Sequence, residues 1–293
     1  MNLEHVEKIA NAVLYEGYLL YPYRPSSVKN RQRFNFGVLH PEAFDVSRMR
    51  TECVVAGASP KVDVKLRCLQ LAERDNWQEG HERDVTITGF ALEPARTEVR
   101  PFRFASDDSG GLKPGARMEN IEGEIELICS RLADGVFKIA VEVRNCVTAG
   151  NQALTRDQAL LRSMISAHTI LQVAGGEFVS LLDPPEVMRQ AVAECENLGT
   201  WPVLVGDVRH RDTMLSSPII LYDYAETAPE SPGDLFDGTE IDEILALRIL
   251  TMTDDEKSEV RNSDDRARRI LERTEMLPPE HFQKLHGALR GMK

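Results

Sequence analysis

Residues 61–71 read KVDVKLRCLQL, a stretch in which apolar and polar side chains alternate along most of its length. Successive side chains of an extended chain point to opposite sides, so Val62, Val64 and Leu66 share one face. Residues 136–144, VFKIAVEVR, repeat the pattern. One apolar face and one wet face are typical of an antiparallel sheet, and both stretches therefore predict a β-rich fold.

A hairpin is expected between the second of these strands and the segment before it. The pair Asp134-Gly135 separates residues 123–132, GEIELICSRL, from residues 136–144, and Asp-Gly supports the positive φ of a tight turn. Residues 84–88, DVTIT, predict a further short strand. Residues from about 34 to 147 thus predict a sandwich or an open antiparallel sheet.

The rest of the chain mixes helical and strand patterns. Residues 3–16 carry apolar side chains at helical spacing. The second half predicts these elements: a helix over 157–171, a strand over 177–182, a helix over 186–195, strands over 201–206 and 217–224, and helices over 240–250, up to about 277, and after Pro278-Pro279.

The predicted fold class is α+β, with an antiparallel β-rich, sandwich-like N-terminal half and a mixed α/β C-terminal half ending in helices. The change of hydrophobic period predicts a boundary near residues 148–156. We therefore expect two domains, residues 1–150 with the N-terminal helix and the β-rich part, and residues 151–293 with the C-terminal helices.

Charge and hydropathy exclude some classes of function. Thirty-five Lys and Arg residues against 47 Asp and Glu give a formal net charge of -12, which disfavours nucleic acid as a partner. No apolar run approaches the roughly 20 residues of a membrane helix, so no membrane span is expected. The first residues lack the apolar core of a signal peptide, and a cytoplasmic protein is expected.

Cysteines and glycines show none of the common cofactor patterns. None of the five cysteines stands in a C-x-x-C pair, which disfavours a zinc or iron–sulfur site. Cys68 and Cys129 fall on apolar faces of predicted strands, where a thiol is usually a buried hydrophobe. The sequence has no P-loop, no dinucleotide fingerprint and no G-x-S-x-G elbow. No cofactor is expected, and catalytic residues cannot be assigned.

Tyrosines and cations gather in residues 15–33, and this segment predicts a docking surface. Tyrosine and arginine carry much of the binding energy of protein interfaces. The predicted anchors and steering cations are Tyr18, Tyr21, Tyr23, Arg24, Lys29 and Arg31. The alternative is a buried aromatic patch with a solvated basic edge.

Carboxylates gather in residues 229–245, PESPGDLFDGTEIDEIL. A hard cation such as Mg²⁺ prefers such oxygen ligands, and Asp234, Asp237 and Glu240 are its candidate ligands. Entry into a helix accounts for them more simply, because first-turn carboxylates suit the positive end of the helix dipole. We therefore predict no metal site. Pairing of the acidic segment with the basic residues 24–33 is a third interpretation.

His168 is the remaining titratable candidate. It lies on the apolar side of the helix expected over 157–171, and no second histidine follows at the spacing of a zinc helix. A hydrogen-bonded core histidine is therefore favoured over a base or a ligand.

Three longer stretches carry a resemblance to a known family: residues 12–39, AVLYEGYLLYPYRPSSVKNRQRFNFGVL; residues 175–185 with 198–206, GGEFVSLLDPP and LGTWPVLVG; and residues 216–257, from SSPIILYDYAE to LTMTDDEK. They resemble a family of bacterial proteins of unknown biochemical function that are often encoded near uptake [NiFe]-hydrogenase genes and their maturation factors. The similarity spans residues from about 10 to 290. It implies a biological setting and supplies no catalytic residues.

These observations predict a non-catalytic accessory or assembly protein that binds a protein partner. The resemblance implies that this partner is a hydrogenase subunit or a maturation factor. A metal-dependent enzyme that uses Asp234, Asp237 and Glu240 with His168 is the alternative, so enzymatic activity stays open. A second alternative is a small-molecule binding module, which requires an apolar pocket in the β-rich half. Self-association is not decided by the sequence.

Overall fold

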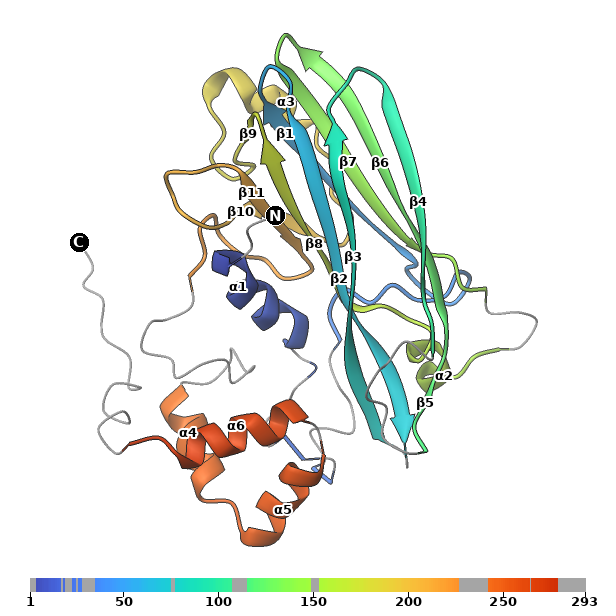
Figure 1. Cartoon of the computed structure of the whole chain (residues 1–293), viewed down its shortest axis with the longest axis vertical. Helices are drawn as coiled ribbons and strands as arrows, with labels where there is room; N and C mark the ends of the chain where they lie inside the picture. Colours follow the sequence, from blue (N-terminus) through green and yellow to red (C-terminus); the bar gives the residue numbers. More distant parts are fainter. Residues whose placement is uncertain are drawn as a thin grey trace. The chain divides into compact units, whose positions relative to one another are not determined.

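The computed structural model describes residues 4–16, 18, 23–24, 26–27, 35–74, 77–106, 115–148, 153–226, 242–263 and 265–278 (Figure 1). The chain forms two compact units. The first comprises Met1–Leu14 and Phe36–Ala225, and the second comprises Tyr15–Asn35 and Glu226–Lys293. The first unit contains two antiparallel sheets and the second contains the C-terminal helices, which confirms the predicted fold class.

The first sheet has five antiparallel strands in the order β4-β6-β7-β1-β9. Their bounds are β1 Arg48–Ala56, β4 Arg96–Phe104, β6 Ile121–Ala133, β7 Val136–Asn145 and β9 Glu177–Phe178. The turn predicted at Asp134-Gly135 joins β6 to β7, and Gly135 adopts a φ of 65°. The predicted hairpin is therefore confirmed.

The second sheet has six strands in the order β10-β11-β8-β2-β3, with β5 paired to one end of β2. Their bounds are β2 Lys61–Arg74, β3 Trp77–Ala91, β5 Arg117–Met118, β8 Ile165–Ala174, β10 Trp201–Leu204 and β11 Thr213–Ser217. The alternating stretch 61–71 lies in β2, between β3 and β8.

The core of the first unit lies between the two sheets. It contains the even positions of β2 from Val62 to Cys68 and the odd positions of β7 from Phe137 to Val143. These are the apolar rows that the period of two predicts. Side chains from two inner faces interdigitate in this way in β-sandwiches. Figure 1 shows the two layers of strands running along each other.

The outer face of the six-stranded sheet carries a second apolar cluster, formed by Ile170 of β8, Val203 of β10 and Leu215 of β11. Helix α1, Glu4–Tyr15, covers it with Val6, Ile9, Ala10 and Val13. Figure 1 shows α1 next to these strands. The spacing of those four residues is that of one helix face, which is why residues 3–16 read as an amphipathic helix.

Two secondary-structure predictions are wrong. The helix expected over 157–171 is a short helix α2, Arg156–Leu160, followed by strand β8. The strand expected over 217–224 is not formed. Strand β11 ends at Ser217, and residues 218–226 form an irregular segment. Residues 157–171 place apolar side chains at helical spacing because β8 is buried on both faces, so nearly all of its positions are apolar. Residues 217–224 form a short apolar run, and such runs do not distinguish helix, strand and packed loop.

The expected domain boundary near residue 150 differs from the observed division. Strand β8 follows that boundary and pairs with β2, which precedes it. The strand-rich unit therefore continues to Ala225. The change of period arises because β8 is buried on both faces, so its apolar residues do not alternate.

The helices predicted for the C-terminal part of the chain are largely confirmed in its described residues. The first unit also contains the short helices η2 Glu186–Met188 and α3 Arg189–Ala193, within the helix predicted over 186–195. The second unit contains α4 Asp242–Leu250, α5 Asp254–Asn262 and α6 Asp265–Glu275. Thr253 and Glu256 form a reciprocal capping box that begins α5. None of the helices in the described part of the chain combines the length and hydropathy of a membrane span.

Candidate functional site

The predicted docking residues of the 15–33 segment are only partly described. Tyr18 is 1% exposed and Tyr23 is 3% exposed, so both side chains are buried. Tyr21, Lys29 and Arg31 lie outside the described residues. The described tyrosines thus correspond to the alternative interpretation, a buried aromatic patch, while the role of the other three residues stays a prediction.

Arg24 pairs with a carboxylate of its own unit. Its guanidinium lies 2.7 Å from Glu256 of α5. Ser26 donates two hydrogen bonds, from its backbone N–H and its hydroxyl, to Glu259 at 2.6 and 2.7 Å. Arg266 of α6 stacks over the ring of Tyr15 at 3.7 Å. These contacts hold the described part of the Tyr/Arg segment against α5 and α6.

The candidate metal ligands Asp234, Asp237 and Glu240 lie outside the described residues. Among the residues that the structure describes, no group of three His, Cys, Asp or Glu side chains is placed to hold a metal ion. The metal-dependent alternative therefore stays a hypothesis about the undescribed segment.

His168 is a buried residue of strand β8 rather than of a helix. Its Nδ1 lies 2.8 Å from the carbonyl oxygen of Ser166, and only a protonated Nδ1 can donate to a carbonyl. Nε2 is then an acceptor, and the structure gives it no partner. The pKa of His168 is lowered to about 4. Burial is the main cause and the nearby charge of Arg67 on β2 adds to it, while the hydrogen bond to the Ser166 carbonyl acts in the opposite direction.

The buried thiols are inert at neutral pH. The three cysteines of the sandwich core, Cys53, Cys68 and Cys129, are buried and form no disulfide. Burial raises the pKa of Cys129 to about 11 and raises the pKa of Cys53 and Cys68 as well. The expectation that Cys68 and Cys129 are buried hydrophobes is confirmed.

The outer face of the five-stranded sheet carries a paired ionic cluster. Glu52, with a nearly buried carboxylate, contacts Arg50 at 2.5 Å and Lys138 at 3.1 Å and accepts the backbone N–H of Glu196 at 2.9 Å. Burial raises the pKa of Glu52, but these three donors outweigh it, and the pKa is lowered. Arg50 also pairs with Glu142 at 3.2 Å. These groups neutralise one another, so the cluster fixes the chain after α3 and leaves no reactive charge.

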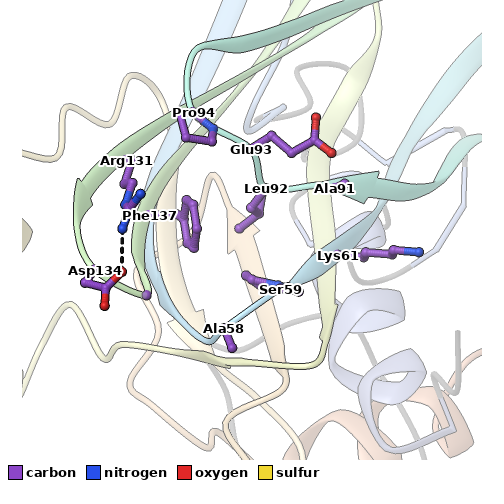
Figure 2. A pocket seen from close by; sticks show the side chains of 12 residues that line it. Ala58, Ser59, Lys61, Ala91, Leu92, Glu93, Pro94, Arg131, Asp134 and Phe137 are labelled. Carbon is purple, nitrogen blue, oxygen red and sulfur yellow. Dashed lines mark hydrogen bonds and ion pairs between the residues drawn. The ribbon is translucent and has the colours of Figure 1, made fainter.

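A pocket of about 470 Å³ opens where three connections between strands meet at one end of the sandwich (Figure 2). Figure 2 shows the side chains of Phe137 and Leu92 next to the space, while Lys61 points away from it. Arg131 and Asp134 form an ion pair at its rim. Its lining combines apolar side chains such as Leu92 and Phe137 with the polar or charged side chains of Ser59, Lys61, Glu93, Arg131 and Asp134. The pocket is therefore mixed in polarity, and it meets only in part the apolar lining that the small-molecule alternative requires.

Residues 218–226 carry two large apolar side chains that are exposed to solvent. Ile220 is 70% exposed and Tyr222 is 82% exposed, whereas Ile219 and Leu221 pack against the apolar cluster under α1. The segment thus turns alternate side chains to the sheet and to solvent. Trp201 of β10, 46% exposed, lies two residues before Val203 and shares its face of the sheet. We call Trp201, Ile220 and Tyr222 the Tyr222 surface.

Hydrogen bonds hold this segment in place beyond the end of β11. The Ser217 hydroxyl donates to the carbonyl of Ile219 at 2.8 Å. Leu204 of β10 donates its N–H to Asp223 at 2.8 Å and accepts the N–H of Tyr224 at 2.7 Å. Asp223 also accepts the hydroxyl of Ser180 at 2.5 Å. Tyr222 therefore projects from a backbone that is fixed on both sides.

Sequence reasoning missed the Tyr222 surface because residues 217–224 were interpreted as a buried strand. The available signal was Asp223, a carboxylate inside an apolar run that a buried strand does not accommodate without a partner. A comparison with protein-family models gave no match, and a search of curated proteins found no similar sequence.

The first prediction concerns His168. Below a pH of about 6.5 an unfolded histidine gains a proton, whereas the folded His168 gains one only near its pKa of about 4. The unfolded state therefore binds more protons in this window, and stability falls as the pH falls. Denaturant titrations at about pH 7.5 and pH 5 should show that His168 accounts for about 2 kcal/mol of the loss of unfolding free energy.

His168→Asn retains a donor near the position of Nδ1 and should reduce the pH-dependent loss by that amount, even if the variant is less stable at both pH values. His210→Asn is the matched control, because His210 is exposed. An equal pH-dependent loss in wild type and His168→Asn would contradict the assignment.

Proposed function

We propose that this protein is a non-catalytic accessory protein that binds a protein partner through the Tyr222 surface. The observation that carries the proposal is the exposure of Tyr222 and Ile220 on a segment whose alternate residues are packed. Tyrosine and tryptophan are the residue types that most often dominate binding energy at interfaces. Grouped large apolar side chains on a surface mark interaction sites more often than scattered ones.

The fixed backbone of residues 218–226 favours binding. Association costs free energy when it immobilises a loop, and a loop already held in place avoids that cost. Asp223 contributes to this fixation, because its carboxylate accepts hydrogen bonds from the hydroxyl of Ser180 and the N–H of Leu204. The N–H of Tyr224 donates to the carbonyl of Leu204 and fixes the next residue. A rigid segment that presents Tyr222 fits a recognition role better than a role in covering the sheet alone.

The resemblance to hydrogenase-associated proteins suggests the partner. We propose a cytoplasmic role in which the partner is a subunit of a [NiFe]-hydrogenase or one of its maturation factors. The basic residues Lys29 and Arg31 stay candidate steering groups. Arg24 is a poor site for a test by charge reversal, because an acidic residue there would face Glu256 and would disturb the second unit.

The test is quantitative capture of the partner by tagged protein from cells grown under conditions that induce hydrogenase. Tyr222→Ala and Ile220→Asp should each weaken capture at least about tenfold, as expected for central interface residues. The matched control is Val187→Ala, an apolar side chain in η2 that is also highly exposed. Circular dichroism checks that each variant is folded.

Equal capture by wild type and Tyr222→Ala would contradict the surface assignment. Loss of capture in Val187→Ala to the same extent would do so as well. Mass spectrometry of the captured protein tests the hydrogenase assignment separately, and an unrelated partner that depends on Tyr222 would support the surface and contradict that setting.

A second candidate function is binding of a small amphipathic molecule in the pocket of Figure 2, whose lining is partly apolar and partly charged. Its volume lies within the range of ligand sites, roughly 300–1,000 Å³. Titration with the fluorescent probe anilinonaphthalene sulfonate should show one saturable site in wild type. Ala58→Trp, which fills the pocket, should abolish that site, while Val187→Trp should not. Non-saturable binding, or equal binding by Ala58→Trp, would exclude this function.

A further inference from the structure

In the described part of the chain, the main strand order of each sheet ends in two edge strands, and three of these four edges are blunted. The edge strand β9 has two residues, and its Phe178 donates its N–H to Arg211 at 2.7 Å. Strand β10 contains Pro202, and residues 223–224 occupy the edge at Leu204. Strand β4 contains Pro101 in its middle. Prolines, short strands and covering segments are the usual devices that prevent an edge from pairing with another chain.

Strand β3 is the fourth edge and shows none of these devices over Asp84–Thr88. It pairs with β2 on one side and is the last strand of its sheet. Among the described residues, Asp84–Thr88 form no backbone hydrogen bond outside that ladder. Lys65 lies 3.6 Å from Asp84 and neutralises the single charge of the stretch. A row of unpaired backbone groups is a template for another strand.

The sequence of this edge is complementary to itself. In an antiparallel pair centred on Thr86, each Val85 lies opposite Ile87 of the second copy, Asp84 lies opposite Thr88, and the two Thr86 residues face each other. Apolar side chains then meet on the inner face and polar side chains on the outer face, with no like charges opposed. Such cross-strand pairs stabilise antiparallel sheets.

The far end of β3 sets the limit of regular pairing. Gly89 adopts a φ of 69° and donates its N–H to Asp63 at 2.7 Å, next to a register shift between Val62 and Val64 of β2. A bulge of this kind bends a strand away from a straight ladder. The free and regular part of the edge is therefore Asp84–Thr88.

We propose that two copies of this chain associate by antiparallel pairing of β3 with β3, which joins two six-stranded sheets into one continuous sheet. The occupant of the edge is a second copy, because the self-pairing places no like charges together and continues both apolar faces. The inference is independent of the Tyr222 surface, which uses other strands.

Sedimentation velocity of the full chain tests the proposal. The wild type should approach twice the monomer mass of 32.9 kDa as its concentration rises to about 100 µM, the range of a weak interface. Thr86→Lys opposes two ammonium groups at the centre of the pair and should raise the dissociation constant at least about tenfold. Thr97→Lys, at an exposed position of edge strand β4, is the control and should leave the dimer unchanged.

An equimolar mixture of Thr86→Lys and Thr86→Glu should restore dimers, now as heterodimers, because opposite charges then face each other. Misfolded variants could not regain association in this way. A wild type that stays at 32.9 kDa would overturn the proposal. So would a dimer that Thr86→Lys leaves intact, or a mixture of the two variants that does not associate.

Discussion

The part of the six-stranded sheet formed by β8, β10 and β11 is apolar on both faces, and this constraint shapes the first unit. Its inner face packs against the five-stranded sheet, as in any sandwich. Its outer face over β8, β10 and β11 presents Ile170, Val203 and Leu215, which water would solvate at a cost. The chain covers that face with α1 and residues 218–226. Over residues 219–222 of the covering segment, Ile219 and Leu221 turn to the sheet and their neighbours Ile220 and Tyr222 turn to solvent.

Much of the β architecture could be predicted because most strands of the first half have one wet face. The alternation in residues 61–68 and 136–144 identifies β2 and β7, and Asp134-Gly135 identifies the turn between β6 and β7. Strand β8 escaped the same reasoning because it lies between β2 and β11 under α1. In a strand buried on both faces, apolar and polar residues no longer alternate, and the strands that pair with it are known only from the assembled sheet.

The candidate site was harder to predict than the fold. The concentration of tyrosine and arginine in residues 15–33 is visible in the sequence, but composition does not predict which residues contact them in the folded chain. Glu259, which binds Ser26, lies 233 residues further along the chain. Conversely, Ile220 and Tyr222 were hidden in an apolar run, because their exposure depends on hydrogen bonds from Leu204 and Ser180 to Asp223.

The central claim is that the covering segment of the sheet is also a recognition surface. Site-specific photocrosslinking in the producing cells tests it most directly, with the photoreactive residue at position 222 and, in a matched experiment, at position 187. The account predicts an adduct of one defined mass from position 222 that excess untagged wild-type protein suppresses and excess Ile220→Asp protein does not. An absence of adduct at position 222, or the same adduct from position 187, would contradict it.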